Sequence, residues 1–142
     1  MAYNILIVDD SAPMRAVIKK VIRASGFDTG TFFEAANGSE ALAVLDGNWI
    51  DLVLTDYNMP DMDGLTLLKK MKADECMQSI PVVMVTTEGS HARVETFIEQ
   101  GAAAYIKKPF TPEAIRQMLN SLLGEPEDGQ GRPEDGDDDL DF

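Results

Sequence analysis

The chain has 142 residues, of which 44% are hydrophobic, and this composition fits a single globular domain with a sizeable core. The net charge of -13 argues against nonspecific binding to nucleic acids or membrane surfaces, because both carry negative charge themselves. The single cysteine, Cys76, excludes an internal disulfide, and the sequence contains neither an apolar signal segment nor a membrane-length run, so we expect a cytoplasmic protein.

Apolar runs alternate with helix-period stripes in the first half of the chain. The run Tyr3–Val8 predicts a buried strand, and Ser11 is a suitable N-cap for a helix that stops at Gly26. The apolar stripe of this helix consists of Met14, Val17, Ile18, Val21 and Ile22. A second strand is predicted over Thr31–Ala35, and a second helix runs from Gly38 to about Asp46.

The second half continues this alternation. Three further strands are predicted, over Asp51–Thr55, Val82–Thr86 and Ala103–Ile106. Helices are predicted after the loop 56–64, over about 90–100, and from Thr111 with Pro112 in the first turn. Five apolar strands that are each followed by a helix require a parallel sheet between helical layers, which is a doubly wound α/β fold.

Polar groups stand at the predicted carboxyl ends of four strands, where such sheets collect functional residues. These groups are Asp9, Asp10, Asp56, Thr86 and Lys108. Two carboxylates about 4 Å apart repel each other by roughly 4 kcal/mol at an effective dielectric constant near 20, so a cation is expected among the aspartates. Oxygen ligands without a nearby histidine or cysteine favour Mg²⁺ or Mn²⁺ over zinc.

The same residues suit phosphoryl chemistry. A divalent metal, the ammonium of Lys108 and the hydroxyl of Thr86 together stabilise the charge of a transferring phosphoryl group. The nucleophile is expected to be a carboxylate, as in aspartyl-phosphate chemistry. Asp56 is the candidate, because it faces the acid pair from a neighbouring strand and can both touch the metal and attack.

Four separated motifs carry a family resemblance. They are DD at 9–10, DYNMPDMDG at 56–64, VTT at 85–87 and KPF at 108–110. In this order they resemble the receiver domains of bacterial two-component response regulators, and most of all the single-domain chemotaxis regulators. The resemblance covers Tyr3 to about Leu123 and implies a flavodoxin-like sheet of strand order 2-1-3-4-5 with five helices.

The resemblance also implies roles for the residues that bind metal and phosphate. Asp56 is similar to the aspartate that a sensor histidine kinase phosphorylates. Asp10, Asp56 and the backbone carbonyl of Asn58 resemble the Mg²⁺ ligands, with Asp9 acting through water. Thr86 and Lys108 resemble the residues that hold the phosphoryl oxygens, and the family has a cis bond where Lys108 precedes Pro109.

Further residues are linked by the resemblance to signal output. Tyr105 resembles an aromatic switch that turns inward when Thr86 moves, while Asn58 and Glu88 stand where residues tune the rate of dephosphorylation. No output domain follows the last helix, so the signal is expected to leave by protein contact through the fourth helix, fifth strand and fifth helix. Expected surface members of this face are Val94, Tyr105, Lys107 and Met118. Lys107 departs from the chemotaxis regulators, which have an apolar residue there.

The segment 124–142 departs from the family pattern. It holds nine acidic residues against Arg132 alone, a net charge of 1 - 9 = -8, and it has few apolar side chains before Leu140 and Phe142. We therefore divide the chain into a receiver domain over 1–123 and an acidic tail that is predicted to be disordered and solubilising. An alternative is that the final residues DDDLDF dock into a basic-rimmed apolar pocket on a partner.

Two other functions were weighed against a phosphorylation switch. A haloacid-dehalogenase-type magnesium phosphohydrolase also uses an aspartate nucleophile, but it has two aspartates two residues apart after the first strand, whereas Asp9 and Asp10 are adjacent and precede Ser11. A flavin-binding domain of flavodoxin type is disfavoured because no phosphate loop rich in Ser and Thr follows the first strand. The chain is thus expected to be a signalling module with a self-catalysed phosphoryl reaction, not a conventional enzyme.

Overall fold

The computed structural model describes residues 2–59, 62–87 and 91–124. In this part of the chain, strands and helices alternate as β1 (Tyr3–Val8), α1 (Ala12–Ala24), β2 (Thr29–Ala35), α2 (Gly38–Gly47), β3 (Leu52–Asp56), α3 (Gly64–Lys72), β4 (Val82–Thr86), α4 (His91–Glu99), β5 (Ala104–Lys107) and α5 (Pro112–Leu123). Among these helices, none has the length and apolar character needed to cross a membrane. The tail 125–142 and Glu88 lie outside the described residues.

The strands form one parallel sheet of order β2-β1-β3-β4-β5, which confirms the predicted fold class. The register aligns the carboxyl ends of the strands. Val8 of β1 is level with Thr55 of β3, and Asp56 of β3 is level with Val85 of β4. Residues that follow these strands therefore emerge at one edge of the sheet.

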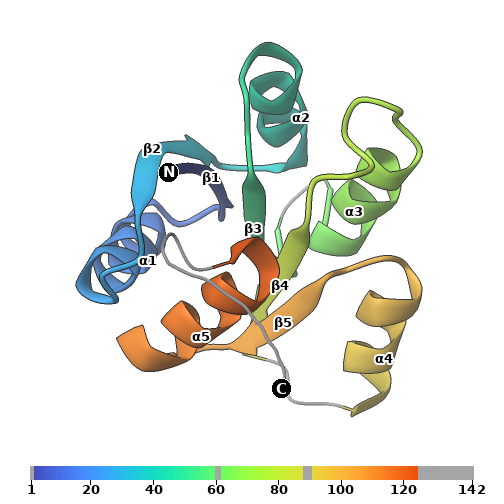
Figure 1. The fold of residues 1–142 in the computed structure, drawn as a ribbon. Helices are drawn as coiled ribbons and strands as arrows, with labels where there is room; N and C mark the ends of the chain where they lie inside the picture. Colours follow the sequence, from blue (N-terminus) through green and yellow to red (C-terminus); the bar gives the residue numbers. More distant parts are fainter. Residues whose placement is uncertain (1, 60–61, 88–90, 125–142) are drawn as a thin grey trace, which may run out of the picture.

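Helices cover both faces of the sheet (Figure 1). On one face, α1 and α5 pack on a core that includes Ile5, Ile7, Ile18, Ile22, Leu52, Leu54, Ile115 and Leu119. On the other face, α2, α3 and α4 pack on a core that includes Leu6, Val53, Leu45, Leu67, Leu68, Met71, Met84 and Phe97. Successive side chains of each strand point to opposite faces, so the unbroken apolar runs supply both cores.

Side-chain caps fix where the helices begin. Ser11, Asp63 and Thr111 each accept a hydrogen bond from the backbone N–H three residues later, as predicted for the first and the last of them. Asn37 caps α2 in the same way. Each such cap contributes about 1 kcal/mol to stability, and together the caps fix the turns that follow the functional ends of the strands.

Two apolar side chains differ from the sequence interpretation. Val17 belongs to the apolar stripe of α1 but is 51% exposed. A tryptophan between a predicted helix and a predicted strand is expected to pack in the core, but Trp49 is 80% exposed. Its indole Nε1 donates to Asp51 Oδ1 at 3.0 Å, so the ring is held at the surface between α2 and β3.

Candidate functional site

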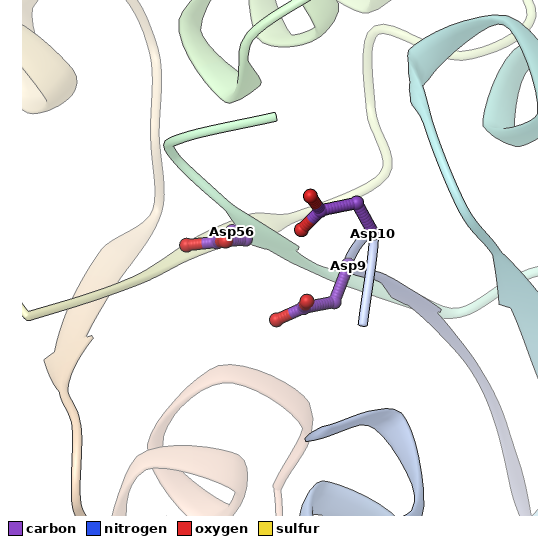
Figure 2. Close-up of side chains that lie close together, drawn as sticks. All are labelled: Asp9, Asp10 and Asp56. Atoms are coloured by element: carbon purple, nitrogen blue, oxygen red, sulfur yellow. The ribbon is translucent and has the colours of Figure 1, made fainter. Parts of the chain in front are cut away.

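Three aspartates meet at the carboxyl edge of the sheet (Figure 2). Asp9 and Asp10 follow β1, and Asp56 ends the neighbouring strand β3. One carboxylate oxygen of each lies within 4.8 Å of the others. Opposite ligands of an octahedral Mg²⁺ ion are about 4 Å apart, so a small inward movement would let these oxygens share one ion. The cluster could therefore hold a divalent metal.

The surroundings of Asp9 support a cation at this place. Its side chain is 2% exposed, and Oδ1 accepts a hydrogen bond from the backbone N–H of Ser11 at 2.9 Å. The second oxygen, Oδ2, is buried and accepts no hydrogen bond from any described residue; the Nζ of Lys108 lies 3.6 Å away from it. A buried carboxylate oxygen without a hydrogen-bond donor is costly, and a metal ion would offset this cost.

Lys108 brings a positive charge to the cluster from the loop between β5 and α5. Its Nζ lies 3.5 Å from Asp56 Oδ1 as well as 3.6 Å from Asp9 Oδ2. Its backbone N–H donates to the carbonyl of Thr86 at 2.8 Å, which ties the loop to the end of β4, and the Lys108–Pro109 bond is cis, as the resemblance implied. One ammonium against three carboxylates leaves a formal charge of -2, which a divalent cation would neutralise.

The environment of Asp56 shifts its titration. Burial raises the pKa of the Asp56 carboxyl above its ordinary value; Lys108 opposes this shift, and the charge of Asp9 adds to it. The anion is thus less stable here than in water. A cation beside Asp56 would reverse the balance and keep the carboxylate ionised for attack on an electrophile.

The remaining predicted site residues are spread along the same edge or lie away from it. Thr86 is buried at the end of β4, level with Lys107 of β5. Asn58 is exposed in the loop that leaves β3. Tyr105 is level with Met84 in the middle of the β4–β5 pair and is 43% exposed.

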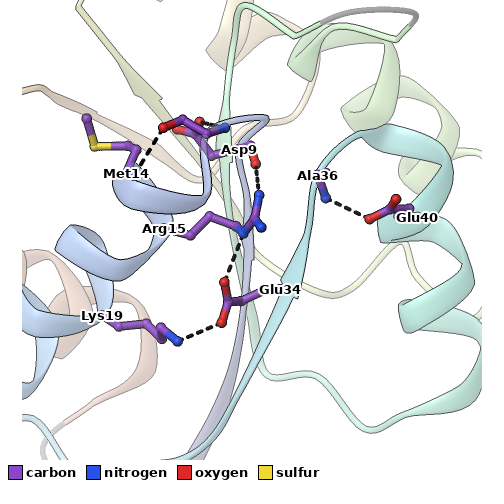
Figure 3. Close-up of polar contacts among 8 residues, drawn as sticks. Asp9, Met14, Arg15, Lys19, Glu34, Ala36 and Glu40 are labelled. Atoms are coloured by element: carbon purple, nitrogen blue, oxygen red, sulfur yellow. Dashed lines mark hydrogen bonds and ion pairs between the residues drawn. The ribbon is translucent and has the colours of Figure 1, made fainter.

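Arg15 supports the site and was not recognised in the sequence. Its guanidinium Nη1 donates to the backbone carbonyl of Asp9, while its Nε donates to Glu34 at 2.9 Å (Figure 3). Lys19 contacts the same glutamate at 2.6 Å, and hydrogen bonds from Lys19 and Arg15 lower the pKa of Glu34. This network ties α1 and β2 to the turn that holds the acid pair. A basic residue one turn into the first helix was the available signal.

Gly64 is a second residue whose role becomes clear only in the structure. A Cβ atom at this position would lie 2.4 Å from the backbone oxygen of Asp56 and 3.1 Å from the Cα of Tyr57. Its backbone N–H donates to the carbonyl of Tyr57 at 2.9 Å. The first turn of α3 therefore packs directly against the backbone of the central aspartate, and only glycine leaves room for it.

Comparison with known proteins agrees with this geometry. The sequence matches the model of the response regulator receiver domain over residues 5–120. The chain is 45% identical over 122 residues to "Chemotaxis protein CheY1" of Helicobacter pylori strain J99, covering 85% of this chain and 97% of that protein. It is 42% identical over 122 residues to "Chemotaxis protein CheY homolog" of Campylobacter jejuni, covering 85% and 92%.

A solved structure gives the same result. The chemotaxis response regulator CheY4 of Vibrio cholerae has a TM-score of 0.77 to this chain at 30% identity, covering 87% of this chain and 100% of that one. The family match spans most of the chain and includes the strand ends that carry the three aspartates. The resemblance inferred from four motifs is confirmed, and the chain belongs to the response regulator receiver domain family.

Proposed function

We propose that the chain is a phosphorylation-activated switch in which Asp56 accepts a phosphoryl group from a histidine kinase or a small phosphodonor. The observation that carries this proposal is the convergence of three aspartates and Lys108 at one sheet edge, with carboxylate oxygens within 4.8 Å. A carboxylate oxygen of Asp56 attacks the phosphorus atom, the bond from phosphorus to the donor breaks, and the donor leaves with the electron pair. The product is an acyl phosphate on Asp56.

Several groups around Asp56 would together stabilise the negative charge of the phosphoryl group. Asp10, Asp56 and the backbone carbonyl of Asn58 would hold Mg²⁺ (or Mn²⁺), with Asp9 acting through water. When bound, the metal supplies positive charge to the phosphoryl oxygens. The ammonium of Lys108 lies 3.5 Å from Asp56 Oδ1, which is near enough for an ion pair with the phosphoryl group once that group is on Asp56. The Thr86 hydroxyl, at the next strand end, is assigned to another phosphoryl oxygen.

A target protein recognises the phosphorylated state by direct contact. Movement of Thr86 toward the phosphoryl group draws Tyr105 inward, and the change reaches a protein target through the face of α4, β5 and α5. The proposed members of this face are Val94, Tyr105, Lys107 and Met118; Tyr105 and Lys107 are exposed, and Val94 and Met118 are partly buried. The names of the relatives point to chemotaxis as the pathway. Asn58 and Glu88 are assigned to the rate of phosphoryl loss, and 124–142 to a separate acidic tail after the receiver domain.

Intact-mass measurement after incubation with acetyl phosphate tests the proposal. Wild type with Mg²⁺ is expected to gain the mass of one phosphoryl group, whereas Asp56→Asn, and wild type with a chelator, gain none. Labelling of Asp56→Asn to the same extent as wild type would refute the assignment. Rapid Mg²⁺-dependent hydrolysis of p-nitrophenyl phosphate, many equivalents per chain, would support a phosphohydrolase and contradict the switch.

A further inference from the structure

An apolar pocket lies between α1 and the loop that precedes α5. Its volume is about 300 Å³, and it is lined by Met14, Val17, Ile18, Val21, Thr87, Lys108, Pro109 and Phe110. Among the described residues, Lys108 and Thr87 are its polar liners, and Lys108 also adjoins the aspartate cluster. The half-exposed Val17 opens the pocket to solvent. The pocket is suited to one or two apolar side chains from a peptide segment.

The α1 side of this pocket is positive, whereas the side lined by Lys108 adjoins the aspartate cluster. Helix α1 carries Arg15, Lys19, Lys20 and Arg23 and no acidic residue. Glu34 pairs with Arg15 and Lys19, but Lys20 is exposed one turn after Val17, on the same face of α1. On the α5 side, Arg116 is exposed and reaches α1, where its Nη1 donates to the carbonyl of Ser25 at 2.8 Å. The α1 side of the pocket therefore favours an acidic segment with apolar side chains.

A second pocket of similar size has the opposite character. It measures about 280 Å³, lies at the amino ends of β3 and β4, and is lined in part by Trp49, Asp51 and Cys76. Asp46, Asp74 and Glu75 belong to the segments that surround it. An acidic peptide is disfavoured there by like charge, so the two pockets distinguish between possible occupants.

The chain itself contains a segment that matches the first pocket. Residues 124–142 carry a net charge of -8, and within them Leu140 and Phe142 are bordered by Asp139 and Asp141. We propose that Leu140 and Phe142 bind in the pocket beside Val17 and Phe110 of their own chain, with the tail aspartates near Lys20 and Arg116.

The length of the connection suits this contact. Leu140 stands sixteen positions after Gly124, at the end of α5, with fifteen residues between them. An uncharged flexible coil of that length has a root-mean-square span of about 22 Å, and repulsion among the tail's acidic residues extends it further. The linker can therefore reach along α5, which leads back to the pocket and is about 18 Å long. A span that matches the linker gives an effective concentration of about a millimolar. Even a weak contact is therefore populated within one chain.

Binding of the tail would act on the neighbouring aspartate site. The occupied pocket covers the side of Lys108 that lines it. Access of an anionic phosphodonor to Asp56 would then be slower, a consequence that rests on the proposed function. The binding itself does not depend on phosphorylation, so it is tested without a phosphodonor.

Amide NMR spectra of the full ¹⁵N-labelled chain test the contact. The double variant Leu140→Ser/Phe142→Ser is expected to shift the signals of residues 14–21 and 108–110 and to leave the signals of α3 unchanged. Val17→Asp is expected to shift the tail signals, whereas the matched variant Ile98→Asp, at a 48% exposed site on α4, is not. Spectra of the double variant that coincide with wild type over 14–21 and 108–110 would overturn the proposal.

Two further measurements separate this contact from its alternatives. Shifts that stay constant on tenfold dilution support binding within one chain, and shifts that vanish on dilution overturn it in favour of a second copy. A nitroxide label on the native Cys76 reports on the second pocket, which that residue lines. Signals of residues 140–142 that remain sharp support the proposal. Broadened signals would place these residues at the second pocket and overturn the proposal.

Discussion

Replacement of Asp10 by alanine should stabilise the chain without metal and abolish its response to magnesium. The carboxylate oxygens of the three aspartates lie within 4.8 Å of one another. At that distance a pair of charges costs about 3.5 kcal/mol at an effective dielectric constant of 20, but only about 0.9 kcal/mol in water. Asp10 is exposed, so the lower figure applies. Relief of two pairs then amounts to about 2 kcal/mol.

In thermal melts, the difference in Tm between wild type and Asp10→Ala should depend on Mg²⁺. In a chelator, Asp10→Ala should melt above wild type, by roughly 5–10 °C for 2 kcal/mol in a domain of this size. With free Mg²⁺ about 20-fold above its Kd, wild type gains about 1.8 kcal/mol, while the variant gains little. The two Tm values therefore approach each other or exchange order.

The control is Asp46→Ala, which removes an exposed aspartate of α2 and should respond to magnesium as wild type does. Circular dichroism melts at matched ionic strength are sufficient. Equal Tm increases in wild type and Asp10→Ala on adding Mg²⁺ would refute the metal assignment. A lower Tm for the variant in the chelator would refute the electrostatic argument.

Three other predictions follow from the site and its supports. Burial raises the pKa of Asp56 in the folded chain above its ordinary value of 3.8, so the folded state loses stability as pH rises through the raised pKa. Without metal, the Tm of Asp56→Asn should therefore exceed that of wild type by an amount that grows from pH 3 to pH 7. A Tm difference that stays constant over this range would contradict burial of the anion. Gly64→Ala forces a Cβ against the Asp56 carbonyl, so it should lower stability by about 1–3 kcal/mol and slow phosphorylation by acetyl phosphate. Gly47→Ala is the neutral control, because its Cβ would meet no atom of the described residues within 4 Å. Thr111→Ala removes the N-cap of α5 and should lower the free energy of unfolding in urea by about 1 kcal/mol, with the phosphorylation rate unchanged. A decrease of less than a few tenths of a kcal/mol would show that the cap does not stabilise α5.

Much of the fold follows from local sequence signals. Strand β1 has the predicted bounds, and the caps at Ser11 and Thr111 start their helices where expected, because an oxygen side chain before an apolar stripe satisfies free N–H groups. The parallel order of the sheet follows from strands that are apolar on both faces. The meeting of Asp9, Asp10 and Asp56 then follows from the topology, since parallel strands end at one edge.

Other features depend on contacts that local signals do not report. The start of β2 at Thr29, two residues before the prediction, is fixed by pairing with Tyr3. The exposure of Trp49 depends on its hydrogen bond to Asp51, and the requirement for Gly64 depends on a carbonyl eight residues earlier. These contacts arise only when segments distant in sequence meet, so periodicity and capping patterns do not predict them.

Asp56 is the proposed site of phosphorylation, and chemical mapping identifies the residue that carries the phosphoryl group. An acyl phosphate is reduced by borohydride to an alcohol, which converts a phosphorylated aspartate to homoserine. After incubation with acetyl phosphate and Mg²⁺, peptide mass spectrometry is expected to find homoserine at position 56 alone, and none when a chelator replaces the metal. Homoserine at Asp9 or Asp10, or at position 56 with equal yield in chelator, would contradict the account.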